Sequence, residues 1–439
     1  MLRISDNSTR FIPDDELKHL SDFEKIANLK INNGGINHNL LVFSNQQEKI
    51  SNEHIFSIND TTISTNNIMG FVGLNESEVT IQSRFAIDDK DYFLHYMLQR
   101  VFSINLFDLK HRTAQESVFD FLLYLFPFYL KKALRQGVYK EYKRKEYNNA
   151  NIKGAVNIAR HIKYNVPFRG TIAYSSREHS YDNKITQLIR HTIEFIKKHR
   201  FAFSILSNDS ETHNSVAEII QATPTYEHNC KTSIINKNLR PLVHPYFSAY
   251  EDLQKICLQI LRYEGLKYGQ EKDKIYGLLF DGAWLWEEYT NAILKDCGFK
   301  HPRNDLSKGG IRLFKERTGY IRYPDFWKEG FIIDAKYKRL DNKEIDRNDM
   351  NQIISYMYVK QALLGGFIYP VSNNNSPILE KEVGYLNGYN GVVKKWNIPI
   401  PNEAVDYKEF CKSIKQNELK LKETIKENDK ALSDNILYK

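Results

Sequence analysis

One short segment constrains this 439-residue chain more than any other. The apolar run Phe331–Ile333 leads directly into Asp334-Ala335-Lys336. Such a run is typical of a buried strand, and a carboxylate at its end is costly to bury without a cation beside it. In a strand, Asp334 and Lys336 project to the same face. Other Asp-x-Lys tripeptides in the chain lie on polar or turn-like stretches, so the apolar lead-in distinguishes this one.

A second acid precedes this strand. Pro324-Asp325 ends a predicted strand over 321–326, followed by a predicted tight turn over 327–330 and a strand over 331–337. If the hairpin pairs position 325 with 332, Asp325 lies diagonal to Asp334 on the same face, with backbones roughly 7–8 Å apart. A register shifted by one residue would turn Asp325 to the other face.

Two carboxylates and a backbone oxygen form the oxygen-rich environment that Mg²⁺ prefers. A lysine beside them can orient a metal-bound water and help to deprotonate it, or stabilise charge that develops on a phosphate. Together these groups can attack a phosphodiester. The alternative interpretation is structural: Asp334 forms an ion pair with Lys336 or with a nearby arginine.

The surrounding pattern predicts a compact α-β-β-β-α-β order. Helical spacing covers 280–295, where Glu287 and Glu288 lie next to an apolar face. A strand over 310–314 precedes the hairpin, and a helix over 346–364 follows it. Gly365-Gly366 is predicted to end that helix, before a buried strand over 367–371.

These residues resemble a known nuclease family. Pro324-Asp325 with Asp334-Ala335-Lys336 is similar to the PD-(D/E)xK motif, and Gln352 with Tyr356 is similar to the Q-xxx-Y signature of RecB-type members. The order of the motifs resembles McrC, the nuclease subunit of the McrBC 5-methylcytosine restriction system. The resemblance is carried by four segments: Leu285-Trp286-Glu287-Glu288-Tyr289, Ile333–Lys338, Asp349–Gln352 and Gly366–Pro370.

The resemblance implies a role for each matching residue. Three acids would hold Mg²⁺ or its water shell, and three further side chains would orient water, brace the site or contact the DNA backbone. The acids are Asp325, Asp334 and Glu287, and the others are Lys336, Gln352 and Tyr356. Glu288 can replace Glu287, because helix phase is not fixed to one residue. Ordinary helix packing is the alternative for Gln352 and Tyr356.

The resemblance also implies the reaction and the partner. We expect a Mg²⁺-dependent endonuclease that cuts double-stranded DNA within a modification-dependent restriction complex. The sequence has no G-xxxx-GK-[ST] phosphate loop, so the motor would be a separate McrB-like AAA+ GTPase that also reads the methylcytosine. Two alternatives remain: an autonomous RecB-type repair nuclease, and a non-catalytic assembly protein that stimulates a partner NTPase.

The expected fold class is a multidomain α+β protein. Residues 1–105 form a β-rich, partner-docking region, 106–270 a mainly helical middle, 271–400 the restriction-endonuclease-like domain, and 401–439 a charged helical tail, exposed or frayed. The polar, lysine-rich stretch 265–274 marks the clearest boundary. The segment 207–238 matches no feature of the resemblance.

Charge and composition limit the remaining classes. The net charge of +8 suits an anionic partner without proving one, and the basic, tyrosine-containing stretch 131–163 is either a DNA contact or a solvated surface. Four scattered cysteines form no CxxC pair, so disulfides and a zinc site are not expected, and a cytoplasmic location fits. No signal peptide and no apolar run of roughly 20 residues is present, so no membrane span is expected.

Overall fold

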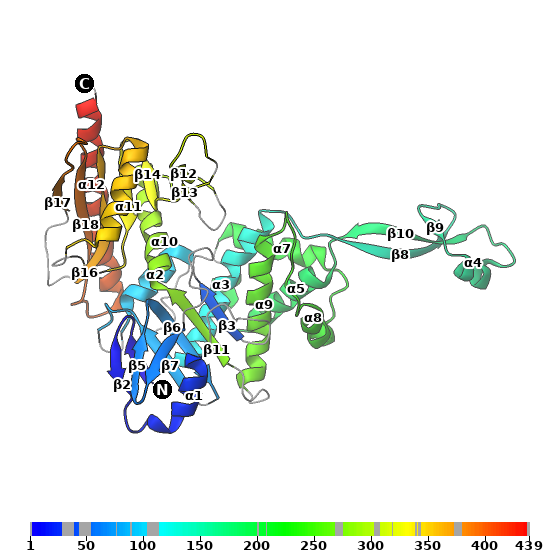
Figure 1. Ribbon diagram of the computed structural model, residues 1–439. Helices are drawn as coiled ribbons and strands as arrows, with labels where there is room; N and C mark the ends of the chain where they lie inside the picture. The colour runs from blue at the N-terminus through cyan, green and yellow to red at the C-terminus, as the bar shows by residue number, and fades with distance from the viewer. Residues whose placement is uncertain are drawn as a thin grey trace. The chain divides into compact units, whose positions relative to one another are not determined.

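The computed structural model describes residues 2–28, 39–43, 54–75, 77–87, 90–102, 114–199, 202–207, 209–267, 275–302, 308–317, 319–338, 340, 344–372 and 380–436. The chain forms two compact units, one of residues 1–108 with 272–439 and one of residues 109–271 (Figure 1). Helices and several sheets confirm the mixed α+β class. The finer division into 1–105, 106–270, 271–400 and 401–439 stays a prediction.

The N-terminal part of the first unit is built on a five-stranded sheet of order β1-β7-β6-β11-β3. Its strands are β1 (Leu2–Ser5), β3 (Asn39–Phe43), β6 (Ile68–Leu74), β7 (Ser77–Gln82) and β11 (Ile275–Asp281). A second sheet contains β2 (Thr9–Phe11), β5 (Thr62–Thr65) and β4 (Phe56–Asn59), and the helices are α1 (Leu20–Ala27) and α2 (Tyr92–Phe102). The N-terminal part of this unit is therefore rich in strands, as predicted.

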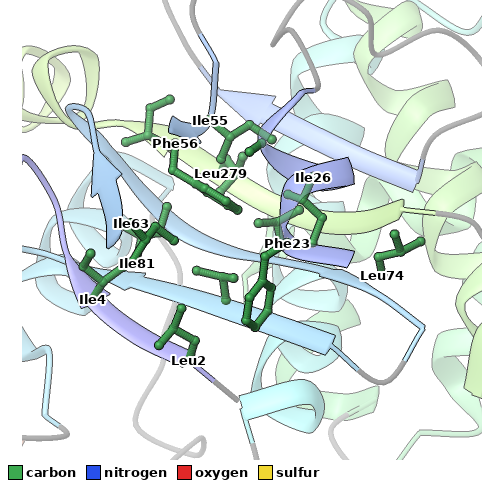
Figure 2. Packing of buried hydrophobic residues seen from close by; sticks show 14 of the residues in the cluster. Leu2, Ile4, Phe23, Ile26, Ile55, Phe56, Ile63, Leu74, Ile81 and Leu279 are labelled. Carbon is green, nitrogen blue, oxygen red and sulfur yellow. The ribbon is translucent and has the colours of Figure 1, made fainter. Parts of the chain in front are cut away.

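Strand β11 joins distant parts of the chain. It pairs antiparallel with β6 and parallel with β3, although some 200 residues separate it from β6 along the chain. Figure 2 shows Leu279 of β11 packed among buried side chains of the N-terminal strands and α1. The first residues of the predicted nuclease region, 271–400, thus complete the N-terminal core.

The helix predicted over 280–295 begins later than expected. The structure has α10 at Gly282–Leu294, and Phe280 still belongs to β11. Asp281 is the N-cap, since its carboxylate accepts hydrogen bonds from the backbone N–H groups of Ala283 (2.9 Å) and Trp284 (3.4 Å). The buried strand preceding the cap was missed because its apolar residues continue smoothly into the apolar face of the helix.

A second five-stranded sheet, of order β14-β15-β16-β18-β17, carries the motif residues. Its strands are β14 (Phe326–Lys328), β15 (Phe331–Ala335), β16 (Leu364–Ser372), β17 (Glu380–Tyr385) and β18 (Val392–Ile400). Strands β14 and β15 form an antiparallel hairpin, and β15 continues through α11 (Arg347–Lys360) to its parallel neighbour β16. Side chains of α11 pack on this sheet in one buried apolar cluster.

Several predicted boundaries in this region are wrong. The strand predicted over 310–314 is only β12 (Ile311–Arg312), which pairs with β13 (Ile321–Arg322) in a separate two-stranded sheet. The predicted turn 327–330 is shorter, because Trp327 and Lys328 belong to β14.

The predicted glycine stop of the helix is also wrong. Helix α11 ends at Lys360, where Gln361 adopts a left-handed conformation (φ 52°). Gly365 and Gly366 lie inside β16. A Cβ on Gly366 would lie 1.9 Å from the Lys394 carbonyl oxygen, so the close approach of β18 requires glycine there.

The C-terminal segment is not a frayed tail. It forms α12 (Tyr407–Ile436), a 30-residue helix with Phe410, Ile414, Leu421 and Ile425 buried. The buried Tyr289 hydroxyl of α10 donates a hydrogen bond to Glu418 of α12 (2.9 Å). The abundant charged residues of this segment hide an apolar stripe, which makes α12 part of the core of the first unit.

The second unit combines helices with an exposed ribbon. Its longer helices are α3 (Ala114–Leu134), α5 (Lys184–Lys197), α7 (Ser210–Ala222) and α9 (Ala249–Lys267), and its shorter ones are α4 (Ile158–Asn165), α6 (Ala202–Leu206) and α8 (Lys231–Lys237). A three-stranded sheet, β8-β10-β9, consists of β8 (Glu141–Asn149), β10 (Ile172–Ser180) and β9 (Ala155–Val156). Much of the basic stretch 131–163 therefore lies in this sheet and in α4, which the prediction of a mainly helical middle did not foresee.

Candidate active site

Asp334 and Lys336 lie at the C-terminal end of β15. Asp334 is 2% exposed, and its Oδ2 lies 2.8 Å from the Lys336 Nζ. The Lys336 backbone N–H donates to the Ile368 carbonyl oxygen of β16 (2.9 Å), which fixes the backbone just beyond the end of β15. The predicted placement of the two side chains on one face is confirmed by their direct ion pair.

Asp325 joins this pair through the hairpin. Strand β14 pairs Phe326 with Ile333, so the same register continued by one residue puts Asp325 opposite Asp334. The Asp325 Oδ2 accepts a hydrogen bond from the Ala335 backbone N–H (2.7 Å). The conditional pairing of position 325 with 332 is wrong by two residues. Because the side-chain period of a strand is two, this shift leaves Asp325 on the same face as Asp334.

A further acid, Asp349, belongs to this group and was not predicted as a site residue. It lies in the first turn of α11, with Oδ1 at 3.2 Å from the Lys336 Nζ and Oδ2 at 2.9 Å from the Lys338 Nζ. Burial raises the pKa of Asp349, but the ammonium groups of Lys338 and Lys336 outweigh burial and hold it below the usual value. The sequence contained one signal for this acid: Lys336 and Lys338 are two residues apart, and both pair with Asp349 of α11.

The surrounding acids determine the charge state of Lys336. Burial alone would lower the pKa of Lys336, but attraction to Asp334, Asp325 and Asp349 raises it above the ordinary value. The side chain is therefore an ammonium ion at neutral pH. In this state it donates hydrogen bonds and neutralises anions.

Gln352 and Tyr356 lie one turn apart on α11. The Gln352 Nε2 donates to the Tyr356 hydroxyl (2.9 Å), and Tyr356 is buried. Burial raises the pKa of Tyr356, and the negative charges of Asp334 and Asp325 raise it further, while the bond from Gln352 lowers it. The two side chains thus form a hydrogen-bonded pair that lies within the electrostatic influence of the two acids.

Glu287 and Glu288 lie on α10, and both face His301. The His301 Nδ1 lies 3.7 Å from the Glu287 Oε1, and its Nε2 lies 3.7 Å from the Glu288 Oε1. The His301 ring also stacks on Phe326 (5.1 Å between centroids), and Nδ1 lies 2.8 Å from the Asp325 carbonyl oxygen. His301 therefore connects α10 to the residue pair at the start of β14. Sequence reasoning missed it, because no spacing pattern links position 301 to the motif.

The acids of this region suit a hard cation by their chemistry. Carboxylate oxygens from Asp325 and Asp334 come from adjacent strands, with Glu287 and Glu288 on the neighbouring helix. Within the described ranges, no three His, Cys, Asp or Glu side chains are already arranged as a metal-binding cluster. In the structure, Lys336 instead neutralises Asp334.

Comparison with known proteins decides the family. Residues 63–370, more than half of the chain, match the family described as McrBC 5-methylcytosine restriction system component. The chain belongs to this family. The predicted resemblance to McrC, the nuclease component of the McrBC system, is confirmed, and the matched range includes all six predicted site residues.

Solved McrBC structures are similar to the chain over much of its length. One is a half-complex from a tetradecameric assembly of Thermococcus gammatolerans McrB AAA+ hexamers with bound McrC. It shows 13% identity and a TM-score of 0.46, and the match covers 94% of this chain and 99% of that chain. Another is the McrBC complex of the same organism, with 12% identity and a TM-score of 0.31; the match covers 67% of this chain and 87% of that chain. No curated protein matches the sequence.

None of the helices among the described residues of this McrBC component is long and apolar enough to cross a membrane. The described cysteines, Cys230, Cys257, Cys297 and Cys411, form no disulfide.

Proposed function

We propose that this McrBC component is the Mg²⁺-dependent endonuclease subunit of a 5-methylcytosine-dependent restriction complex. The observation that supports the proposal most strongly is the convergence of Asp325, Asp334 and Lys336 at the end of the β14–β15 hairpin. Asp325 lies just before β14, Asp334 and Lys336 lie at the end of β15, and Asp334 is buried. A buried carboxylate and a lysine held in this way form a prepared site for a cation and a phosphate.

Each side chain then has a chemical role. Asp325 and Asp334 would hold Mg²⁺, together with Glu287 or Glu288 of α10. Bound Mg²⁺ would polarise the scissile phosphate and lower the pKa of a coordinated water. Lys336, already an ammonium ion, would shift from Asp334 to the phosphate oxygens and stabilise the charge that develops on them.

The neighbouring residues would keep Lys336 in place. Asp349 contacts the Lys336 ammonium, so it would hold this side chain when a metal ion replaces the contact to Asp334. Gln352 and Tyr356 would brace the helix that carries Asp349, and Gln352 would reach the DNA backbone. These roles give Asp349 a positioning function that the sequence motif does not include.

The same proposal places GTP hydrolysis and methylcytosine recognition on another chain. The sequence contains no phosphate-binding loop, and the family is named as one component of a system. We therefore place a McrB-like AAA+ GTPase beside this subunit, which would act on double-stranded DNA delivered by that partner in the cytoplasm.

The exposed ribbon of the second unit is the best surface for this partner. In Figure 1, β8 and β10 form a long two-stranded ribbon that carries β9 and α4. Four large apolar side chains on and after α4 are exposed: Ile158, Ile162, Val166 and Phe168. Such a cluster on a soluble chain marks an interaction surface. We place a partner contact here, in addition to the predicted docking of residues 1–105.

The division of labour is tested by comparing cleavage with and without the partner. We expect the purified chain with Mg²⁺ to cut DNA poorly and without preference for methylated sites. Addition of the AAA+ partner and GTP should give strong cleavage of duplexes that contain 5-methylcytosine. Efficient cutting by the chain alone would favour an autonomous repair nuclease. Stimulated GTP hydrolysis without any cleavage would favour a non-catalytic assembly protein.

A further inference from the structure

The second unit contains a cavity that the cleavage reaction does not use. Its volume is about 420 Å³, and it lies where the segment 207–238 meets the C-terminal end of α5. This segment is the one that the family resemblance leaves without a role. The principal lining residues are three from α5 and its cap and three from the segment: His191, Phe195, Lys198, Tyr226, His228 and Lys231.

Aromatic rings form much of the wall. The His191 and Tyr226 ring centroids are 4.7 Å apart, and the Phe195 ring lies beneath the Lys231 ammonium at 5.3 Å. The Arg190 guanidinium covers the Tyr226 ring at 4.8 Å. Rings held in this way offer flat apolar surfaces against which another planar group can stack.

The charge of the cavity is positive. Lys198 and Lys231 both line it, and the Lys198 Nζ lies 3.0 Å from the His228 Nε2, where it can only donate. The acid in the lining, Glu194, is already paired with Arg190 (2.9 Å) and Lys197 (2.8 Å). The cavity therefore favours an anionic group near Lys198 and Lys231.

His191 supplies a buried polar group. It is 4% exposed, and its Nε2 has no hydrogen-bond partner among the described residues. Burial, reinforced by the positive charges of Lys231 and Arg190, lowers the pKa of His191 to about 4. The ring is therefore neutral at physiological pH and offers one donor and one acceptor. A buried polar nitrogen without a partner is unfavourable, and a polar group on a ligand would relieve that cost.

We propose that this cavity binds a small anion that carries a planar ring. Its acidic group would pair with Lys198 and Lys231, its ring would stack against Tyr226 and His191, and a polar ring edge would reach His191. Nucleoside monophosphates have all three features, and aromatic carboxylates have the acidic group and the planar ring. The site is independent of the acids at the β14–β15 hairpin and does not depend on the proposed cleavage reaction.

Titration calorimetry on the full chain tests the proposal, with adenosine 5′-monophosphate and benzoate as probes. We expect at least one probe to bind, and adenosine or inorganic phosphate alone to bind more weakly. Lys198→Met should weaken binding about tenfold or more, because it removes a charged hydrogen-bond donor. Lys255→Met is the matched control, since Lys255 of α9 pairs with Glu251 and neither residue is part of the lining. It should leave binding unchanged.

A second variant distinguishes nucleoside monophosphates from aromatic carboxylates. His191→Phe keeps a ring in the wall but removes its polar nitrogens, so it should weaken the nucleotide, which has a polar ring edge, more than benzoate. The proposal is overturned if neither probe binds at millimolar concentration. It is equally overturned if Lys198→Met and His191→Phe bind both probes as tightly as the unmodified chain.

Discussion

At the scale of single residues, the site depends on the two ion pairs that Lys336 forms. Lys336 contacts two acids, Asp334 at 2.8 Å and Asp349 at 3.2 Å. Lys338, two residues further on, forms an ion pair with Asp349 (2.9 Å) and is more exposed than Lys336. Both lysines pair with Asp349, but Lys336 also contacts the buried Asp334. A comparison of the two therefore distinguishes a specific role beside Asp334 from a general effect of positive charge.

Replacement of these lysines should therefore have unequal effects. We expect Lys336→Met to lower the cleavage rate about a hundredfold or more, because it removes the donor placed for the phosphate. Lys338→Met should lower the rate less than about tenfold, since it removes only a partly exposed contact. Rates would be measured on a methylated duplex with the partner, GTP and Mg²⁺. Equal losses in the two variants would contradict a specific role for Lys336.

At the scale of elements, the end of β15 is held from two sides. The Ile368 carbonyl of β16 accepts from the Lys336 N–H, and Arg84, just beyond β7, donates to the Tyr337 carbonyl oxygen (3.2 Å). The Arg84 guanidinium also lies over the Tyr337 ring (4.6 Å) and forms an ion pair with the buried Asp6. A residue beside the N-terminal sheet thus holds the backbone next to Lys336 in place.

Arg84→Met should destabilise the protein. It leaves the Asp6 carboxylate buried without its cation, and loss of one partner of a buried ion pair costs about 3–5 kcal/mol. Arg10 is a control, since it also donates to a backbone carbonyl, that of Arg3 (3.0 Å), but is exposed. Arg10→Met should change the free energy of unfolding by less than about 0.5 kcal/mol. Denaturant unfolding measures both, and an unchanged midpoint for Arg84→Met would refute the anchoring role.

Local signals allowed much of the hairpin to be predicted from sequence. Alternation placed Asp334 and Lys336 on one face, but the register depended on the turn, which is tighter than expected because β14 extends to Lys328. Asp349 and His301 escaped prediction because only tertiary packing brings them to the motif. Strand β11 escaped for the same reason, since its partners lie in a remote part of the sequence.

The exposed ribbon could not be predicted for a different reason. Strand β8 has no apolar alternation, and most of its residues are exposed. Pairing with β10 stabilises it, with Tyr147 and Tyr174 stacked at 5.3 Å and Tyr147 donating to Glu178. A strand held by cross-strand contacts rather than by a core has a sequence that looks like a solvated, charged segment.

At the scale of the whole molecule, we assign cutting to the motif residues of the first unit and one partner contact to the ribbon of the second. The motif residues all lie within 272–439, whereas the exposed apolar cluster of the ribbon lies within 109–271. Substitutions of the motif residues should therefore affect cleavage, and substitutions in the exposed apolar cluster should affect partner binding.

The apolar cluster of the ribbon provides the test of partner contact. Ile158 and Phe168 are 70% and 69% exposed, so replacing both with serine should leave the free energy of unfolding nearly unchanged. If the cluster contacts the AAA+ partner, the double variant should weaken binding about tenfold to a hundredfold. Phe203→Ser, which changes an equally exposed ring of α6 outside the ribbon, is the control. Unchanged partner affinity in the double variant would place the interface elsewhere.

We propose that Asp334 and its neighbours cut DNA, and removal of the Asp334 charge tests this proposal. Cleavage of a 5-methylcytosine duplex by the complex with Mg²⁺ and GTP would be compared for the unmodified chain and Asp334→Asn, which keeps the shape of the side chain. We expect a loss of about a hundredfold or more, with partner binding and GTP hydrolysis retained. Cleavage at the unmodified rate by Asp334→Asn would contradict it.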